Sequence, residues 1–355
     1  MILKKINFKK REKKLNNRIV VSPMCQYSAK DGCPTEWHYR HLSNLCLSGA
    51  SLVVLESTAV SNHGRISNKD LAISTNKQKK EFKKLINFLQ SNKKTLVGIQ
   101  LSHAGRKGSS EVPWIKKNSP LKGKSSWQTI SSSELPKDKG WPKPKKMNHK
   151  DIKSVINNFK RAILNSLEAN FDSLELHMAH GYLLHQFLSP VCNTRNDNYG
   201  GSMEKRFKFP LEIARIARRL WPKNKLLGAR ITGEDHLKDG IKISETVKFC
   251  KKLENIGFDY VCVSSGGILT KTNLKFKKFF RAKLAREIKK KTNLKVGITG
   301  MTEDFILAEK YIKKGYFDNV FIGRPFLKNP FFLYNQKILR RKGIKILPIQ
   351  YSRAF

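Results

Sequence analysis

The sequence predicts an α/β protein folded as a single closed (β/α)8 barrel, a TIM barrel, with a long insert after its third strand. Eight short apolar runs rich in Val and Ile alternate with longer amphipathic segments, which is the pattern of βαβ units around a parallel sheet. The length of 355 residues suits one barrel with extra loops. An open doubly wound sheet is disfavoured, because the first run ends in Ser-Pro-Met-Cys and no G-x-G-x-x-G stretch occurs.

The eight expected strands are, in chain order, RIVVSPM (18–24), SLVVLESTAV (51–60), TLVGIQLSH (95–103), DSLELHMA (172–179), LLGARIT (226–232), YVCVSSG (260–266), KVGITG (295–300) and NVFIGRPF (319–326). Amphipathic patterns predict helices at 35–48, 77–92, 149–169, 204–220, 243–256, 279–291 and 302–315, with an eighth beginning near residue 330. Since no linker or internal repeat divides the chain, we expect residues 1–355 to form a single domain.

The connection after the third strand, residues 104–148, is long and rich in Ser, Pro and Lys, and it contains Trp114, Trp127 and Trp141. A loop of that length in a compact domain is usually a lid, a binding loop or disordered. Because it follows a strand, we expect it on the catalytic face of the barrel, as a lid over the site.

The chain carries 71 Lys and Arg against 27 Asp and Glu, a formal net charge of +44 at pH 7. Such a balance suggests a polyanion partner. The lysines are spread over nearly every polar segment, however, and come with abundant Asn and Ile, which indicates a compositional bias. A nucleic-acid-binding protein on a degenerate barrel is therefore a remote alternative. The charge should still attract anionic ligands.

The apolar runs are much shorter than the ~18 residues of a membrane span. The amino terminus is charged and has no secretory signal pattern, so a cytoplasmic protein is expected. Six cysteines are scattered without a C-x-x-C pair, which argues against a zinc module and against a disulfide framework.

In such a barrel the active site is built at the carboxyl ends of the strands. The polar residues and glycines expected there are Ser22, Cys25, Tyr27, Ser57, Thr58, Gln100, His103, His177, His180, Tyr182, Arg230, Ser264, Ser265, Thr299, Gly300, Gly323 and Arg324. This ring is rich in hydrogen-bond donors and has no close cluster of carboxylates.

His177 and His180 follow the fourth strand three residues apart. In a strand they would point to opposite faces, so both meet one ligand only if the chain turns near Ala179, and Gly181 favours that turn. Three interpretations stay open. The pair donates hydrogen bonds to an oxygen that gains negative charge, or it binds a metal, although no H-E-x-x-H helix or third ligand accompanies it, or it only packs and caps. His185 falls within a continuing helix, where we expect it to pack.

Two loops near the carboxyl end have the residues that a phosphate requires. The pairs Thr299-Gly300 and Gly323-Arg324 follow the seventh and eighth strands, which is where barrels commonly bind phosphate. Glycine allows close approach of the backbone, and arginine offers a planar fork of donors. Their agreement in position predicts a phosphorylated cofactor.

Gln100 and Arg230 are expected on opposite sides of the barrel mouth, where an amide and a fixed cation would grip a planar heterocycle. A cation beside such a ring stabilises its reduced, negatively charged form. The alternative is that Arg230 pairs with Glu175 or Glu234 as scaffolding.

Six segments in this order carry a resemblance to a known family: SPMCQYSAKDGCPTEWH, GIQLSHAGRK, ELHMAHGYLLHQFLSPVCNTRNDNYGGSMEKR, ARIT, VSSGG and FIGRPFLKNP. Over essentially the whole chain, the sequence resembles the old yellow enzyme family of NADH:flavin oxidoreductases, and most of all its thermophilic-like ene-reductase branch. The H-x-x-H-G-Y segment and the residues after it are highly specific. The resemblance implies a bound flavin mononucleotide (FMN) that takes hydride from NADPH or NADH and reduces an electrophilic alkene.

The resemblance also implies a role for each matching residue. The flavin ring and ribityl chain would be surrounded by Ser22, Pro23, Met24, Cys25, Ser57, Gln100 and Arg230, and the phosphate would be held by Thr299, Gly300, Gly323 and Arg324. His177 and His180 would donate to the carbonyl oxygen of the substrate. Tyr182 would protonate its α-carbon, and Tyr27 would line the pocket. Cys25 would lie beside the flavin and modulate its potential.

In this branch the C-terminal arginine, here Arg353 in the tail 341–355, enters the active site of a neighbouring subunit, which implies a homodimer or homotetramer. Two residues depart from the family pattern. Lys205 lies at a helix start, and Ser57 offers an additional hydrogen bond near the flavin. The same resemblance leaves open a relative that demethylates N-methylated amines or reduces dienoyl-CoA compounds.

Overall fold

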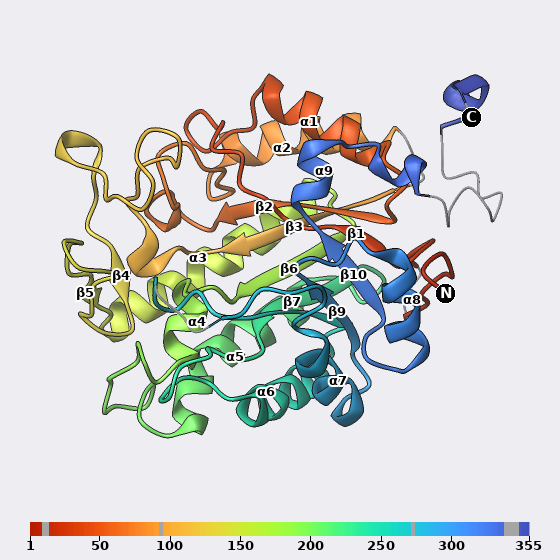
Figure 1. Ribbon diagram of the computed structural model, residues 1–355. Helices are drawn as coiled ribbons and strands as arrows, with labels where there is room; N and C mark the ends of the chain where they lie inside the picture. The colour runs from red at the N-terminus through yellow and green to blue at the C-terminus, as the bar shows by residue number, and fades with distance from the viewer. Residues whose placement is uncertain (9–13, 92–94, 271–273, 337–347, 355) are drawn as a thin grey trace.

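Parallel pairing of the eight predicted runs closes a barrel (Figure 1). The computed structural model describes residues 1–8, 14–91, 95–270, 274–336 and 348–354. The strands pair in the order β1-β10-β9-β8-β7-β6-β3-β2. Their bounds are β1 Ile19–Val21, β2 Leu52–Ala59, β3 Leu96–Ser102, β6 Ser173–Met178, β7 Leu226–Thr232, β8 Tyr260–Ser264, β9 Lys295–Thr299 and β10 Asn319–Ile322. Each strand lies within its predicted run, so the prediction of a (β/α)8 barrel is confirmed.

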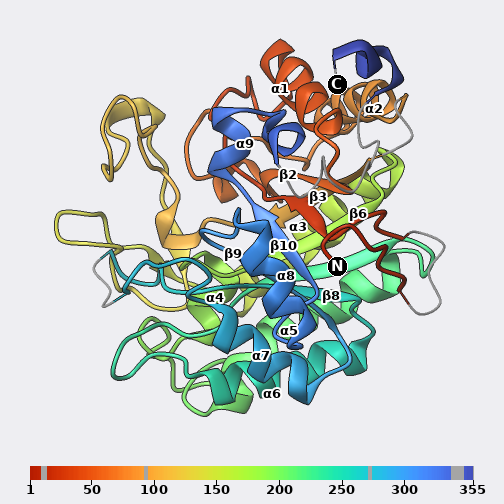
Figure 2. The same ribbon diagram turned by 45° about the vertical axis from the view of Figure 1, so that its right-hand side comes forward.

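Helices surround the barrel (Figures 1 and 2). Those that follow the first seven barrel strands are α1 Glu36–Cys46, α2 Asn76–Gln90, α3 His149–Glu168, α5 Met203–Leu220, α6 Ile243–Ile256, α7 Ala282–Lys291 and α8 Phe305–Lys313. Among them, α2 and α3 begin with reciprocal caps, in which the N-cap side chain accepts from the N–H of the third helical residue and the side chain of that residue accepts from the N–H of the N-cap. These caps are Thr75 with Gln78, and Asn148 with Asp151. The predicted helix positions agree to within a few residues.

The eighth unit differs from the prediction. β10 ends at Ile322 instead of continuing to residue 326, and α9 (Arg324–Lys328) starts before the predicted position near 330. The reason is Pro325. It has no N–H to donate in a sheet ladder, and its fixed φ suits the first turn of a helix. A 3-10 turn, Phe332–Asn335, follows.

Apolar side chains fill the barrel interior and the layer between strands and helices. Inside the barrel the rings of Tyr260 and Phe321 stack with their centroids 6.1 Å apart. Gly228 makes room for this pair, because a Cβ at that position would lie 2.1 Å from the Tyr260 ring. Ile6 and Leu15, paired across an antiparallel bridge, pack against the interior residues near the amino ends of the strands.

The insert after β3 lies beside the carboxyl ends of the strands, at the left of Figure 1. It contains the 3-10 turns Gly105–Lys107 and Gly123–Ser125 and a small sheet formed by β4 (Ile130–Ser131) and β5 (Lys145–Lys146). The guanidinium of Arg106 anchors it by donating to the carbonyls of Pro136 at 3.2 Å and Ile268 at 2.7 Å.

All six cysteines are free thiols. Among the described residues, no helix combines the length and the apolar character needed to cross a lipid bilayer.

Candidate active site

A cavity of about 880 Å³ opens at the carboxyl ends of the strands, within the range of about 300–1,000 Å³ that is usual for cofactor and ligand sites. Predicted residues in its wall are Ser22, Pro23, Met24, His180, Arg230, Ser264, Thr299, Gly300, Gly323 and Arg324. Residues in the wall that the sequence did not single out include Phe276, Arg281, Thr302, Glu303 and Lys328. Four of the lining side chains are Arg or Lys and one is a carboxylate, so the cavity favours an anionic ligand.

Strand register brings the predicted polar residues of β3, β6 and β7 together. Gln100 pairs in register with Glu175, and His177 pairs with Arg230. Because β6 is the only strand between β3 and β7, the prediction that Gln100 and Arg230 face each other across the barrel mouth is wrong. The third and fifth strands of an eight-stranded barrel are near neighbours around its circumference.

Arg230 and Gln100 both act on the buried Glu175. Nε2 of Gln100 donates to Oε1 of Glu175 at 2.7 Å. Burial raises the pKa of the Glu175 carboxyl, and the positive charge of Arg230 opposes that shift. Arg230 therefore acts on Glu175 through its charge, but the ion pair that the scaffolding alternative expects is not found among the described residues. The Nε of Arg230 has no hydrogen-bond partner among the described residues, and the side chain lines the cavity.

β6 ends at Met178 and the chain then turns. His180 (φ +57°) and Gly181 (φ +74°) are both in the left-handed conformation. This confirms the turn predicted from the sequence, and it places the rings of His177 and His180 with centroids 5.1 Å apart. His180 lines the cavity, and His177 is buried next to it.

A chain of hydrogen bonds fixes the protons of the two rings. Nδ1 of His177 accepts from the N–H of Ala179 at 3.2 Å, so the proton of the neutral ring is on Nε2, which lies 3.3 Å from Nδ1 of His180. His180 then has its proton on Nε2, 2.5 Å from Oγ of Ser264. Burial, and then the charge of Arg230, lowers the pKa of both imidazoles well below the ordinary 6.5, so both are neutral at pH 7.

Within the described part of the chain, the two rings belong to no group of three His, Cys, Asp or Glu side chains whose ligand atoms converge. The geometry therefore gives the metal interpretation no third protein ligand and favours the hydrogen-bond donor interpretation.

Tyr182 is the N-cap of the short helix α4 (Leu183–Leu188). Its ring meets His177 edge to face, with centroids 4.6 Å apart at 81°. Nζ of Lys107 lies 5.5 Å from the centroid of the Tyr182 ring. Burial raises the pKa of this phenol well above its ordinary value near 10, so Tyr182 keeps its proton.

Cys25 lies next to two buried carboxyl groups, with its Sγ and the nearest oxygens of Glu56 and Asp70 all within 4.8 Å of one another. Glu56 sits at a bulge in β2 and pairs with Nε2 of His38 at 3.2 Å. Burial raises the pKa of Asp70 to about 7. Burial, followed by the negative charge of Asp70 and Glu56, raises the pKa of the Cys25 thiol well above 9, so it stays neutral. Sequence reasoning missed Glu56 and Asp70, because neither follows the end of a predicted strand.

Tyr27 and Ser57 lie close to this group. The Oγ of Ser57 is 2.5 Å from the Oγ of Ser102 on β3, so the hydroxyl that departs from the family pattern is bonded within the barrel. Tyr27 has a left-handed backbone (φ +49°), and its ring contacts Trp114 of the insert edge to face at 5.6 Å. The insert therefore reaches a predicted substrate-binding residue.

Arg281 was not predicted and is a prominent part of the cavity wall. Its Nε donates to Oγ of Ser265 at 2.8 Å, and its Nη1 donates to the carbonyl of Thr299 at 2.8 Å. Gly300 lies beside it with φ +98°, which favours glycine, and a Cβ there would lie 2.2 Å from Nη1. Burial lowers the pKa of Arg281 to about 9, at which it is still protonated at pH 7. Arg281 could not be expected from its position in the sequence, because it lies in a segment predicted as helix, well beyond the end of β8.

His185 is buried in α4 with its Nε2 3.1 Å from Oδ1 of Asp235, in agreement with the packing role expected for it. Arg353 is exposed in the 3-10 turn Ile349–Ala354 and is not among the residues that line the cavity. Tyr351 of the same turn packs against Phe331, with ring centroids 6.1 Å apart. Of the tail predicted to meet a neighbouring subunit, residues 341–347 and 355 lie outside the described residues.

Residues 2–342 match the family described as NADH:flavin oxidoreductase / NADH oxidase. The chain is 37% identical over 332 residues to an NADH:flavin oxidoreductase of Gibberella zeae. The aligned region covers 88% of this chain and 80% of that protein. The chain is 34% identical to an NADPH dehydrogenase of Listeria welshimeri over 98% of both chains, and 34% identical to one of Geobacillus thermodenitrificans over 96% of this chain and 95% of that one. A solved 2-naphthoyl-CoA reductase complex has the same fold, with a TM-score of 0.83 and 19% identity over 94% of this chain. The chain spans 51% of that larger protein.

Proposed function

The chain belongs to the NADH:flavin oxidoreductase / NADH oxidase family, and we propose that its active site reduces the activated C=C bond of α,β-unsaturated carbonyl compounds and related electrophilic alkenes. The protein is an FMN-dependent oxidoreductase that uses NAD(P)H as its reductant. The alkene and the roles of the individual residues are proposals, and they are argued from the site.

The cavity residues fit FMN. Nε of Arg230 has no partner among the described residues and is a donor suited to the acceptor edge of the flavin ring. At the β9 and β10 ends, Gly300 and Gly323 keep the wall free of side chains, and a Cβ at Gly323 would lie 3.1 Å from Sδ of Met24. Arg324 and Lys328 line the same cavity and supply cations for a phosphate.

When bound, FMN would accept a hydride from NAD(P)H and deliver it to the β-carbon of the alkene. His177 and His180 are neutral and supply N–H donors to the carbonyl oxygen of the substrate. Their protons are engaged by His180 and Ser264, so a substrate oxygen has to compete with these acceptors. Fixed donors in a buried site stabilise the negative charge that develops on that oxygen and lower the barrier to hydride attack.

Tyr182 is the proton donor in this proposal. A phenol whose pKa is raised by burial releases its proton only to a strongly basic carbon, such as the α-carbon of the enolate. Cys25 is a neutral thiol, so its influence on the flavin potential would come from its polarity and volume rather than from a negative charge.

The observation that carries the proposal is that His177 contacts both Tyr182 and His180, and that His180 lines the cavity. The protein should be loaded with FMN and given NADPH or NADH with 2-cyclohexenone, N-methylmaleimide or a nitroalkene. Formation of the saturated product, detected by chromatography, supports the proposal. Oxidation of an N-methylated amine, or reduction of a dienoyl-CoA, without any reduction of these alkenes would overturn it in favour of the corresponding alternative.

The proposed assembly is a homodimer or homotetramer in which Arg353 enters the site of a neighbouring subunit and the insert 104–148 acts as the lid. Its support is that Arg353 is exposed outside its own cavity and that Trp114 of the insert contacts Tyr27. Sedimentation analysis should give a species of at least two chains. Arg353→Ala should raise the KM for the alkene without changing that mass, and a purely monomeric, fully active protein would contradict the proposal.

A further inference from the structure

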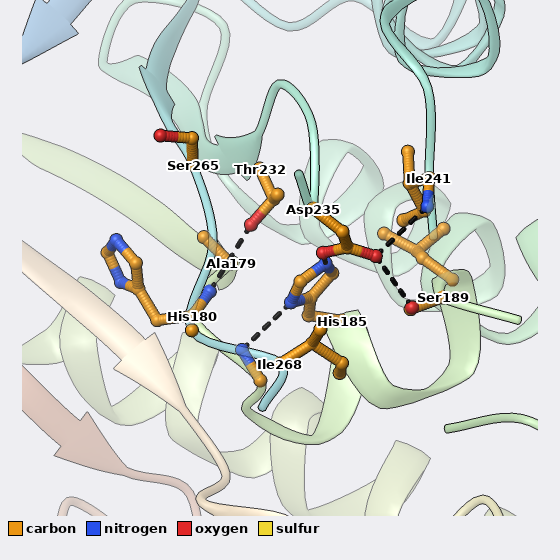
Figure 3. Close-up of polar contacts among 12 residues, drawn as sticks. Ala179, His180, His185, Ser189, Thr232, Asp235, Ile241, Ser265 and Ile268 are labelled. Atoms are coloured by element: carbon orange, nitrogen blue, oxygen red, sulfur yellow. Dashed lines mark hydrogen bonds and ion pairs between the residues drawn. The ribbon is translucent and has the colours of Figure 1, made fainter. Parts of the chain in front are cut away.

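The backbone of the His180–Gly181 turn is held by four side chains, one for each of its polar groups. They are Oγ1 of Thr232 for the N–H of His180 (3.3 Å), Nζ of Lys107 for the carbonyl of His180 (2.7 Å), Nδ1 of His185 for the N–H of Gly181 (2.8 Å), and Nε2 of Gln186 for the carbonyl of Gly181 (2.7 Å). Figure 3 shows the two N–H contacts. A left-handed backbone is unfavourable for histidine, because its Cβ crowds a carbonyl oxygen, so this turn depends on such support.

His185 is itself held in place (Figure 3). Since its Nδ1 accepts the N–H of Gly181, the proton of the neutral ring is on Nε2, 3.1 Å from Oδ1 of Asp235. The other oxygen of Asp235 accepts from Oγ of Ser189 at 2.7 Å and from the N–H of Ile241 at 3.0 Å. Both His185 and Asp235 are fully buried. The Asp235 carboxylate thus orients the His185 imidazole, and the imidazole in turn holds the backbone N–H of Gly181. The outer hydrogen-bond partners of metal-ligating histidines orient those rings in the same way.

Lys107 joins three loops. It lies in the 3-10 turn that opens the insert after β3, and its Nζ donates to the carbonyl of His180 in the β6 loop and, at 3.0 Å, to the carbonyl of Gly267 in the β8 loop. These two loops touch backbone to backbone, because a Cβ at Gly267 would lie 2.8 Å from Cα of His180. A Cβ at Gly181 would lie 2.3 Å from the carbonyl oxygen of Gly267. Nζ of Lys107 therefore donates to both carbonyls at the closest approach of the loops, although burial lowers its pKa to about 7.

We propose that Lys107 and the His185–Asp235 pair are positioning residues for His180. They act without touching the substrate: they hold the left-handed turn that keeps the imidazole of His180 at the wall of the cavity. The inference rests on the proposed function, because it takes His180 to be a donor to the substrate. Displacement of a donor by about 1 Å lowers a rate by up to about 100-fold, so the loss of either support should be measurable.

The test is a pair of double-mutant cycles. Lys107→Met and His185→Leu should each lower kcat/KM for 2-cyclohexenone by about 10-fold or more, with full FMN occupancy. In a His180→Ala background the same substitutions should cost less than about twofold, because residues that act through one another are not additive. If these substitutions cost as much in the His180→Ala background as in the wild type, and His180→Ala is itself impaired, the inference is overturned and the proposed function stands. An unimpaired His180→Ala variant would overturn both.

Two controls separate positioning from a general loss of structure. Lys124→Met removes another cation of the insert, an exposed one in the 3-10 turn Gly123–Ser125, and should leave kcat/KM unchanged. His185→Asn keeps an acceptor near the position of Nδ1 and should recover part of the activity lost in His185→Leu. Amide hydrogen exchange provides a readout that does not depend on turnover. The segment 176–190 should exchange faster in His185→Leu than in wild type, and unchanged exchange would contradict the proposed support of the turn.

Discussion

His177 and His180 are hydrogen-bonded to one another, with 3.3 Å between Nε2 of the first and Nδ1 of the second. The remaining proton of the pair, on Nε2 of His180, points to Ser264. A substrate oxygen therefore competes with the Ser264 hydroxyl. Ser264→Ala should lower the Kd of an enone about two- to tenfold, the range that corresponds to one hydrogen bond of ~0.5–1.5 kcal/mol. Titration of the flavin absorption measures it, and weaker binding would instead show that Ser264 helps to hold the substrate.

Tyr182→Phe should separate hydride transfer from protonation. Removing a positioned acid costs about 100- to 10,000-fold in a step that needs it, so reduction of 2-cyclohexenone should fall by that factor. Reduction of a quinone, which requires no protonation at carbon, should change little. Stopped-flow assays with both acceptors on one enzyme preparation measure the difference. An equal loss with both acceptors would argue against Tyr182 as the donor to carbon.

Arg281 places a second guanidinium in the wall that contains Arg230. A cation near the flavin favours its negatively charged reduced form. Arg281→Gln should therefore lower the two-electron potential of the bound flavin by about 30 mV, which corresponds to a tenfold change in equilibrium. A dye-coupled redox titration measures this shift. Arg281→Lys retains the charge and should restore most of the wild-type potential. An unchanged potential in Arg281→Gln would show that the residue only braces Ser265 and Thr299.

His103 should make the protein sensitive to mild acid. Burial lowers the pKa of this imidazole to about 4, below its ordinary value of 6.5. Between these values the unfolded chain binds a proton that the folded chain does not, so the contribution to stability is complete above pH 6.5 and is lost as the pH falls toward 4. Where the unfolded chain binds one proton more than the folded chain, the unfolding free energy falls by roughly 1.4 kcal/mol for each unit by which the pH falls.

The matched variant for this prediction is His103→Asn, which keeps an acceptor for the N–H of Gly105, 3.0 Å from Nδ1 of His103 in the wild type. Urea unfolding at pH 6.5 and at pH 5 measures how much unfolding free energy each protein loses between these two pH values. That loss should be about 2 kcal/mol smaller in the variant than in the wild type. All other titrating groups are common to the two proteins and cancel in the comparison. Identical pH dependence would mean that His103 is protonated in the folded state.

The barrel could be predicted from the sequence because each strand is a buried, β-branched run bounded by polar turns. The errors arose where that signal is weak. β4 and β5 have two residues each, too few for a periodic pattern. The strand that ends at Ile322 was extended too far because the apolar Pro325 and Phe326 continue the run, although proline suits the start of a helix.

The candidate site was predictable where residues follow a strand directly. The turn at His180 could be expected from the adjacent Gly181, which tolerates a left-handed backbone. Arg281 and Lys107 could not be found in this way, because long side chains bring their charges to the site from positions outside the strand ends. Glu56 was hidden within an apolar strand, because a bulge in the sheet cannot be read from alternation.

The central claim is that the two imidazoles activate an alkene for hydride delivered within this cavity. Its most direct test is a single turnover under anaerobic conditions, with the protein loaded with FMN and one equivalent of NADPH. NADPH should bleach the visible flavin absorption, and 2-cyclohexenone should restore it. In a His177→Ala/His180→Ala double variant, the restoration should be slower by at least about 100-fold, the cost of losing an oxyanion donor. Equal rates of restoration in the two proteins, or no restoration in the wild type, would contradict the claim.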